Sequence, residues 1–265
     1  MKKLKIWTKE MKTTSRYISI RLKTISIIMT LALVFAALQG CSGGKNESAR
    51  GGNGDLSSYF VDFEKLKKEN SDIFGWIHIP DTDIDYPVVQ SSDGDDSFYK
   101  NHNSLKESDS RGAIYIEAAN MKDMCDFNEV IHGSSPEDGS LFAGLEKFLD
   151  RNYFDEHTYI YIYLDGNALI YYVFAAYTRD DERLLEQYDF SYASGCQAFL
   201  DEIYGTKTMG KIVRSGWEDA VRPENFLVTL STVDPASKNQ IVVVGCLVGD
   251  VAGKIDRFVD YSDPE

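Results

Sequence analysis

Thiols and imidazoles are the side chains in this 265-residue chain best suited to nucleophilic, acid–base or metal chemistry, and the sequence has four of each. The cysteines are Cys41, Cys125, Cys196 and Cys246, and the histidines are His78, His102, His132 and His157. They occur singly, without the CxxC or HExxH spacing that metal sites use. The sequence therefore predicts no metal site, no disulfide framework and, because it also lacks a glycine-rich phosphate loop, no cofactor.

Cys246 lies in an apolar run, QIVVVGCLV, which extends from Gln240 to Val248. A free cysteine in such a strand usually packs as a small apolar side chain. A reactive thiol needs an electropositive and partly exposed setting, and no basic residue is close to Cys246 in sequence. We therefore expect a buried thiol there, and we expect Cys125 and Cys196 to be packing residues or unpaired surface thiols.

Short runs rich in Ile, Val, Tyr and Phe predict the strands that must position any such groups. Eight runs have this character: Trp76 to Ile79, Tyr86 to Val89, Ala113 to Ile116, Glu129 to His132, Tyr159 to Leu164, Ala168 to Thr178, Phe226 to Val233 and Gln240 to Val248. Between two of them, Asp165-Gly166-Asn167 predicts a hairpin turn. Eight short strands are typical of a barrel or a sandwich, so we expect a mainly β fold with peripheral helices.

Helical spacing of apolar residues occurs in three segments. These are Leu56 to Asn70, Leu141 to Leu149 and Tyr192 to Tyr204. No repeat of 20 to 50 residues is present, which argues against a solenoid. We expect residues 58–265 to form one β-dominated domain, which is within the usual size range.

The N-terminus has the pattern of an export signal. Residues 1–40 carry eight basic side chains and one acidic one, and the apolar run Ile25 to Leu38 ends at Gly40-Cys41. This run is shorter than the 20 or so residues of a membrane span, and a small residue before cysteine resembles a bacterial lipoprotein cleavage site. We expect residues 1–40 to be a signal peptide, Cys41 to be lipidated, and residues 41–57 to be a flexible linker. An uncleaved signal anchor is the alternative.

The rest of the chain is strongly acidic. Residues 41–265 hold 20 basic side chains against 41 acidic ones. Because phosphate contacts need lysine or arginine, this composition argues against a nucleic-acid partner. An exported, acidic domain is instead expected at the extracellular face of the bacterial cell membrane.

Several motifs resemble those of class B sortases. The first is DIFGWIHIPDTDIDYPVVQ, from Asp72 to Gln90. It is followed by FYKNHN from Phe98, RGAIYI from Arg111, NEVIHGSSPEDGSLF from Asn128, LVTLSTV from Leu227 and QIVVVGCLV from Gln240. They occur in the order expected for the family. The resemblance implies an eight-stranded barrel with an N-terminal helix and a helix in the loop before the penultimate strand.

The resemblance also implies an extracellular cysteine transpeptidase, but this sequence differs from the family at the reactive positions. Ser134 stands where the family has its histidine, Val233 where it has its cysteine, and Cys246 where we expect its arginine. Sortase chemistry needs a thiolate, an imidazole and a cation for the oxyanion. We therefore expect a pseudo-enzyme whose partner is an extended sorting-signal peptide or a cell-surface protein.

Two active alternatives remain open at this point. Cys246 could act as a nucleophile with His132 as its base. If His132 and Ser134 are both extended they face the same side of one strand, about 6.6 Å apart, and the resemblance places the arginine position at the same cleft. Ser134 could instead be the nucleophile of a hydrolase, although it would need an adjacent base and His132 lies two residues back on the same strand.

Overall fold

The computed structural model describes residues 61–205, 210–218 and 220–264. The predicted signal peptide, the predicted linker, Cys41 and the start of the first predicted helix lie outside the described residues. The strands are β1 (Ile73–His78), β2 (Asp85–Val89), β3 (Ile114–Ile116), β4 (Asn128–His132), β5 (Tyr159–Leu164), β6 (Asn167–Arg179), β7 (Ile212–Val213), β8 (Leu227–Val233) and β9 (Gln240–Asp250).

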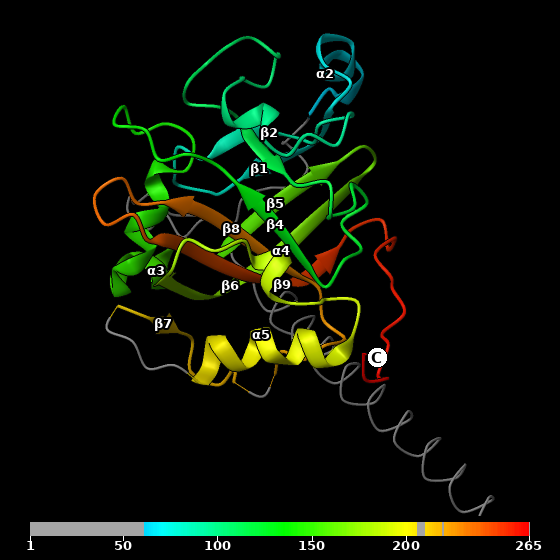
Figure 1. Ribbon diagram of the computed structural model, residues 1–265, viewed down its shortest axis with the longest axis vertical. Helices are drawn as coiled ribbons and strands as arrows, with labels where there is room; N and C mark the ends of the chain where they lie inside the picture. Colours follow the sequence, from blue (N-terminus) through cyan, green and yellow to red (C-terminus); the bar gives the residue numbers. More distant parts are fainter. Residues whose placement is uncertain (1–60, 206–209, 219, 265) are drawn as a thin grey trace, which may run out of the picture. The chain divides into compact units, whose positions relative to one another are not determined.

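Eight of these strands close into a barrel (Figure 1). The order around the ring is β5-β1-β2-β3-β4-β8-β9-β6, and β6 pairs back with β5. The two-residue strand β7 lies outside the ring, paired with β6 at Ala175 and Ala176. All eight predicted strands are present, so the predicted eight-stranded, mainly β barrel is confirmed. In the β5–β6 hairpin Leu164 pairs with Asn167, which leaves Asp165 and Gly166 as the expected two-residue turn.

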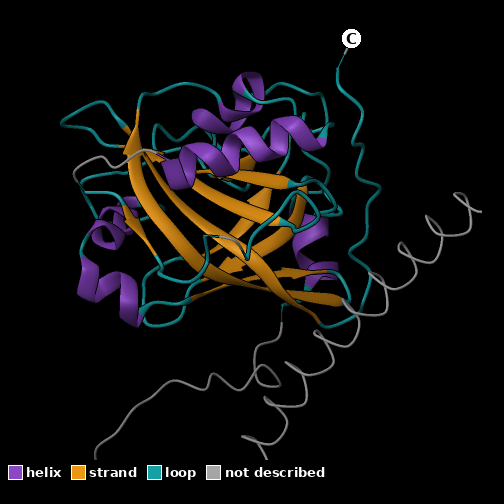
Figure 2. Ribbon diagram, turned by 90° about the horizontal axis from the view of Figure 1, so that it is seen from below, coloured by secondary structure: helices purple, strands orange, loops and turns teal. Residues whose placement is uncertain are grey.

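The helices lie around the barrel (Figure 2). They are α2 (Phe63–Glu69), η2 (Phe98–Lys100), η3 (Ala143–Leu149), α3 (Arg151–Glu156), α4 (Leu184–Gln187) and α5 (Ala193–Gly205). The predicted helix before the penultimate strand is α5, whereas α3 and α4 were not predicted. The segment predicted as a helix at 141–149 is a 3₁₀ helix, which ends where the Asp150 side chain caps the backbone N–H groups of Asn152 and Tyr153. None of the described helices is long and apolar enough to cross a bilayer.

The apolar residues form a core on each side of the sheet. Because side chains alternate along a strand, Val228 and Leu230 of β8 point into the barrel, whereas Leu227 joins the cluster on the outer face. That outer cluster packs against α5 through Cys196, Phe199 and other apolar side chains of the helix. The helix thus covers one part of the outer face of the barrel.

Strands β4 and β8 run parallel, and this pairing arranges the loops. Parallel strands end at the same edge of a sheet, so the segments that follow His132 and Val233 emerge together. Strand β9 is antiparallel to β8, and its first residue, Gln240, pairs with Val233. The loop after β4 and the β8–β9 hairpin, which are distant in sequence, therefore meet at one end of these strands.

Glu129 of β4 is a fully buried carboxyl group. Its Oε1 accepts a hydrogen bond from the backbone N–H of Asp126 at 3.2 Å, while Oε2 has no partner among the described residues. Burial raises the pKa of Glu129 well above its ordinary value, and the charge of Asp126 raises it further. The folded barrel therefore favours the protonated form of this carboxyl group.

We predict that Glu129→Gln stabilises the protein increasingly as the pH rises. A carboxyl group with a raised pKa in the folded state costs stability once the pH exceeds its pKa in the unfolded chain, about 4.3, because the folded state must then keep a proton or bury a charge. The gain in unfolding free energy should be larger at pH 8 than at pH 5, by about 1.4 kcal/mol for each pH unit over which the folded state keeps the proton. Urea unfolding of both proteins at the two pH values measures it, and an equal effect at both would contradict the prediction.

Candidate functional site

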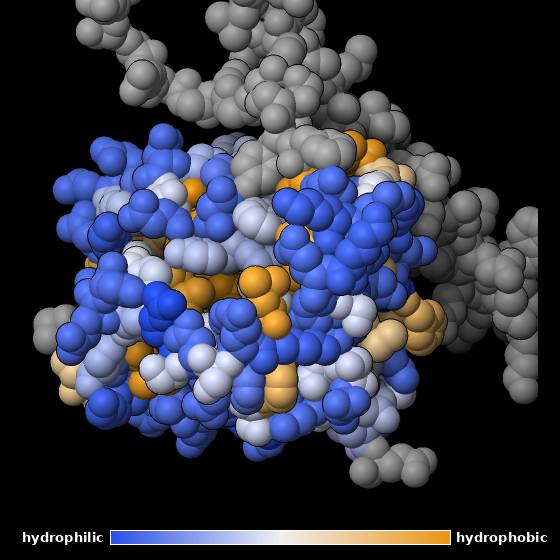
Figure 3. Space-filling model, turned by 90° about the horizontal axis from the view of Figure 1, so that it is seen from above, coloured by the Kyte–Doolittle hydropathy of each residue, from blue (hydrophilic) through white to orange (hydrophobic). Residues whose placement is uncertain are grey.

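A cleft of about 570 Å³ opens where β4, β8 and β9 meet. Its lining includes His132 and Ser134 from the β4 side, Val233 and Gln240 from the β8–β9 hairpin, and Arg183 from the segment before α4. On the face of the molecule seen in Figure 3, hydrophobic residues gather near the centre and hydrophilic residues surround them. The cleft is large enough to accommodate several residues of an extended peptide.

The strand register brings two of the three predicted reactive positions together. Gly133 donates its backbone N–H to the carbonyl oxygen of Ser231 at 3.1 Å, which extends the β4–β8 pairing one residue beyond His132. Val233 lies two residues beyond Ser231, so Ser134 and Val233 line the same cleft. The residue that completes this cluster on β9 is Gln240, the pairing partner of Val233.

Cys246 is not part of this cluster, which corrects our placement of the arginine position. Cys246 pairs with Leu227 at the opposite end of β8, whereas His132 pairs with Ser231. Four residues separate Leu227 from Ser231, a distance of about 13 Å along the strand. If a cation is needed beside the cysteine position, the residue of β9 in the right place is therefore Gln240. Gln240 could have been identified from the sequence. Because the connection between β8 and β9 is short, the last residue of β8, Val233, must pair with a residue near the start of β9.

The Cys246 thiol is buried beneath α5. Burial raises the pKa of this thiol to about 12, so it is protonated near neutral pH. A protonated and inaccessible thiol cannot attack a carbonyl group. The structure thus agrees with the expectation of an inert thiol and separates Cys246 from His132.

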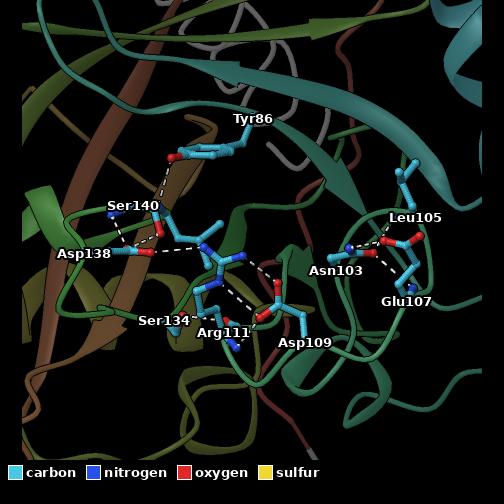
Figure 4. Close-up of polar contacts among 10 residues, drawn as sticks. Tyr86, Asn103, Leu105, Glu107, Asp109, Arg111, Ser134, Asp138 and Ser140 are labelled. Atoms are coloured by element: carbon cyan, nitrogen blue, oxygen red, sulfur yellow. Dashed lines mark hydrogen bonds and ion pairs between the residues drawn. The ribbon is translucent and has the colours of Figure 1, made fainter.

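Ser134 has a structural hydrogen bond (Figure 4). Its Oγ donates to the backbone carbonyl of Arg111 at 2.5 Å. The Arg111 guanidinium in turn pairs with Asp109 at 2.9 Å and with Asp138 at 3.0 Å. These contacts tie the loop after β4 to the loop before β3. The Ser134 proton is therefore directed to a backbone oxygen and not to an imidazole base.

Because Gly133 has no side chain, the loop after β4 packs closely against Ile114 and Phe142. A Cβ atom at Gly133 would lie 2.4 Å from Ile114 Cδ1 and 2.7 Å from Phe142 Cδ2. The Tyr86 hydroxyl adds a second tie, since it accepts a hydrogen bond from the backbone N–H of Leu141 at 3.0 Å (Figure 4). The loop that carries Ser134 is thus held by packing as well as by hydrogen bonds.

His132 lies in the floor of the cleft. Its ring stacks on Tyr115 with 5.2 Å between centroids, and its Nε2 is 3.8 Å from Glu117 Oε1. Burial lowers the pKa of His132, although the charge of Glu117 opposes this effect. His132 Nε2 makes no hydrogen bond to any described residue. The sequence motifs pointed to His132 but not to Glu117, which is distant in sequence and reaches the cleft only because β3 pairs with β4.

Two arginines at or near the cleft are paired with acidic partners. Arg183 contacts both oxygens of Glu117, at 3.1 and 3.0 Å, and pairs with Asp96. Arg179 donates to the Gln240 side-chain oxygen at 2.9 Å and also pairs with Glu202. Arg179 is thus the guanidinium that contacts Gln240, and an acidic partner already engages it.

The remaining thiols and histidines have packing or surface positions. Cys196 of α5 is buried, and Cys125 is partly exposed. His102 stacks on Phe98 and bonds its carbonyl at 2.8 Å, and His78 lies 3.4 Å from Asp85. Within the described ranges, no three His, Cys, Asp or Glu side chains gather in a way that could hold a metal ion.

We predict that Cys246 resists alkylation in the folded protein. Burial and protonation both slow thiolate chemistry, so iodoacetamide should modify the partly exposed Cys125 first and Cys246 only after denaturation. Peptide mass mapping after a timed exposure at pH 8 measures both, and Cys196 provides a second buried control. Modification of Cys246 as fast as Cys125 would show that our placement of Cys246 is wrong.

Comparisons with known proteins agree with the barrel fold. No family model matches the chain. It is 30% identical over 203 residues to sortase B of Listeria monocytogenes, which covers 74% of this chain and 76% of that protein. A mutant form of Clostridium perfringens sortase B superposes with a TM-score of 0.62 at 28% identity, covering 70% of this chain and 86% of that one.

A complex of Staphylococcus aureus sortase B with its substrate is also similar. Its TM-score is 0.60 at 28% identity, covering 70% of this chain and 84% of that one. The matched length and the closed eight-stranded barrel point to one shared fold. The chain therefore belongs to the sortase B family.

Proposed function

We propose that this protein is a pseudo-sortase: it binds an extended sorting-signal peptide, or an extended segment of a cell-surface protein, in the cleft without cutting it. The observation that carries the proposal is the convergence of Ser134, Val233 and Gln240 at the one place where the family chemistry requires a base, a nucleophile and a cation. The cleft has the position and size of a binding site, and its reactive groups are replaced.

None of the three side chains can perform the step expected at its position. Valine has no lone pair with which to attack a carbonyl carbon, and serine cannot exchange a proton near neutral pH. Glutamine is neutral, so it stabilises a developing oxyanion less than a guanidinium would. For comparison, loss of the nucleophile alone lowers turnover about 10⁶-fold in the serine protease subtilisin. Residual turnover should therefore be undetectable.

The lining of the cleft suits the backbone of a peptide. Val233 is 36% exposed and offers an apolar surface, while Thr232 Oγ1 and His132 Nε2 are buried polar atoms without a hydrogen-bond partner among the described residues. A bound peptide supplies both N–H and C=O groups that can satisfy such atoms. A related S. aureus protein holds a substrate in its complex, which supports the same use of the cleft here.

We predict that the protein neither cleaves nor transfers a sorting-signal peptide, and that Val233→Cys alone does not restore turnover. The triple variant Ser134→His, Val233→Cys, Gln240→Arg should gain measurable cleavage, because it restores base, nucleophile and cation together. The matched control carries Ser134→His and Val233→Cys but keeps Gln240, and it should be at least about 10²-fold slower, since it lacks the cation. Chromatography of a labelled peptide measures cleavage.

Two results would contradict this account. One is turnover by the unmodified protein that disappears in Cys246→Ala. The other is equal activity of the triple variant and its control when circular dichroism shows that both are folded.

We further propose that the domain is held at the extracellular face of a bacterial membrane, either by a lipid on Cys41 or by an uncleaved signal anchor. We predict that Cys41→Ser loses the lipid, alters signal processing and moves the protein out of the membrane fraction. A lipid contributes about 0.8 kcal/mol for each buried CH₂ group, so two acyl chains hold a protein firmly. Mass spectrometry of the mature N-terminus tests this; an intact Met1 would identify the signal anchor instead.

A further inference from the structure

A row of three side chains crosses neighbouring strands at one side of the cleft. Gln240, the first residue of β9, pairs with Val233 of β8 on one side and with Arg179 of β6 on the other. Directly paired residues of antiparallel strands point to the same face of the sheet, with Cβ atoms about 5 Å apart. Val233 and Gln240 both line the cleft. The Gln240 side chain therefore lies between an arginine and the position at which the family chemistry requires a nucleophile.

Arg179 fixes the orientation of the Gln240 amide. Its Nη1 donates a hydrogen bond to Gln240 Oε1 at 2.9 Å. A guanidinium has only N–H donors and no acceptor, so the amide atom that faces it must be the oxygen. Turning the amide over would set N–H donors against N–H donors and break this bond. The chemistry of Arg179 thus holds the amide in one of its two orientations.

The guanidinium is itself held in place by several acceptors. Arg179 Nε donates to Glu202 Oε1 at 3.2 Å, and Nη1 also donates to the backbone carbonyl of Glu182 at 3.0 Å. Its Nη2 donates to the side-chain oxygen of Gln187. The Arg179 side chain is 8% exposed, and Arg179 is not one of the described residues that line the cleft. Its effect on a ligand in the cleft is therefore exerted through Gln240.

The nitrogen of the Gln240 amide has donors that the fold does not use. Gln240 Nε2 makes no hydrogen bond to a described residue, and it is not one of the fully buried polar atoms, although the residue as a whole is 4% exposed. Because the oxygen faces Arg179 on the β6 side, Nε2 lies on the Val233 side, within the lining of the cleft. An amide whose oxygen accepts from a cation is also a stronger donor, since hydrogen bonds polarise one another. The cleft thus presents N–H donors to an acceptor.

We propose that Gln240 Nε2 donates a hydrogen bond to a carbonyl oxygen of the peptide that occupies the cleft, and that Arg179 is a positioning residue that keeps the amide turned for this contact. The inference rests on the proposed function and adds the chemical group that is recognised, a carbonyl oxygen of the peptide backbone or of a peptide side chain. Glutamine at this position is thus a binding residue as well as the replacement of a cation.

Gln240→Glu tests the donor. Glutamate has nearly the same shape and forms an ion pair with Arg179, so the fold is kept, but it presents an oxygen to the cleft in place of the N–H donors. The probe is a fluorescent heptapeptide selected from a random library for binding to the unmodified full-length protein, and fluorescence anisotropy measures its Kd. We expect Gln240→Glu to raise the Kd at least about tenfold. The urea midpoint of unfolding should not fall, which separates lost binding from lost stability.

Arg179→Gln tests the positioning. Its new amide can donate or accept, so both orientations of the Gln240 amide become populated, and the Kd should rise at least about twofold. This loss should disappear in the Gln240→Glu background, because a carboxylate has no orientation to lose. Arg151→Gln is the matched control and should leave the Kd unchanged, since Arg151 is exposed and pairs with Asp155 away from the cleft.

Two series of peptides identify the acceptor. One replaces each backbone carbonyl in turn with a thiocarbonyl, which is a weaker acceptor, and the other replaces each side chain with alanine. One replacement should weaken binding to the unmodified protein and have no effect on binding to Gln240→Glu. Equal Kd values for these two proteins, or a loss from Arg179→Gln that persists beside Gln240→Glu, overturn the inference and leave peptide binding intact. A library without any peptide that binds overturns the proposed function and this inference together.

Discussion

The cleft depends on the parallel pairing of β4 with β8. His132 pairs with Ser231, and this register sends the segments after both strands to the same end of the barrel. The antiparallel hairpin from β8 to β9 then brings Gln240 beside Val233. A shift of one residue in either pairing would turn Ser134 or Val233 to the opposite face of the sheet. The arrangement of the site is thus a consequence of strand register, which the two cores on either side of the sheet maintain.

The strands could be predicted well because their signal is local. Runs of Ile, Val and Tyr bounded by turn residues identified β5, β6, β8 and β9 nearly to their ends. Register is not local, and the prediction from motifs was wrong for Cys246, which we placed at the cleft and which lies beneath α5. The segment 141–149 has helical spacing, yet it forms a 3₁₀ helix before Asp150 caps a separate helix.

Some residues of the site could be predicted from the sequence, and others could not. Ser134 and Val233 could be found in the sequence, because each lies at the end of a recognisable strand motif. Glu117 and Arg183 could not, since their importance arises from a contact between segments distant in sequence. The hydrogen bond from Ser134 to the Arg111 carbonyl could not be predicted from the sequence either. It explains what a serine contributes at that position. Serine, valine and glutamine at these positions are compatible with a well-packed barrel, so the fold does not depend on reactive groups in the cleft.

Cross-linking of β8 to β9 tests the central claim, that Gln240 and not Cys246 lies beside Val233. Directly paired residues on antiparallel strands have Cα atoms about 4.5 to 5.5 Å apart, which suits a disulfide. The measurement is the intact mass after mild oxidation of two proteins, one with Val233→Cys, Gln240→Cys and Cys246→Ala, the other with Val233→Cys alone. We expect the first to lose the mass of two hydrogens through an intramolecular disulfide, and the second to keep the thiol at position 233 free. A disulfide between positions 233 and 246 in the second protein would contradict the account.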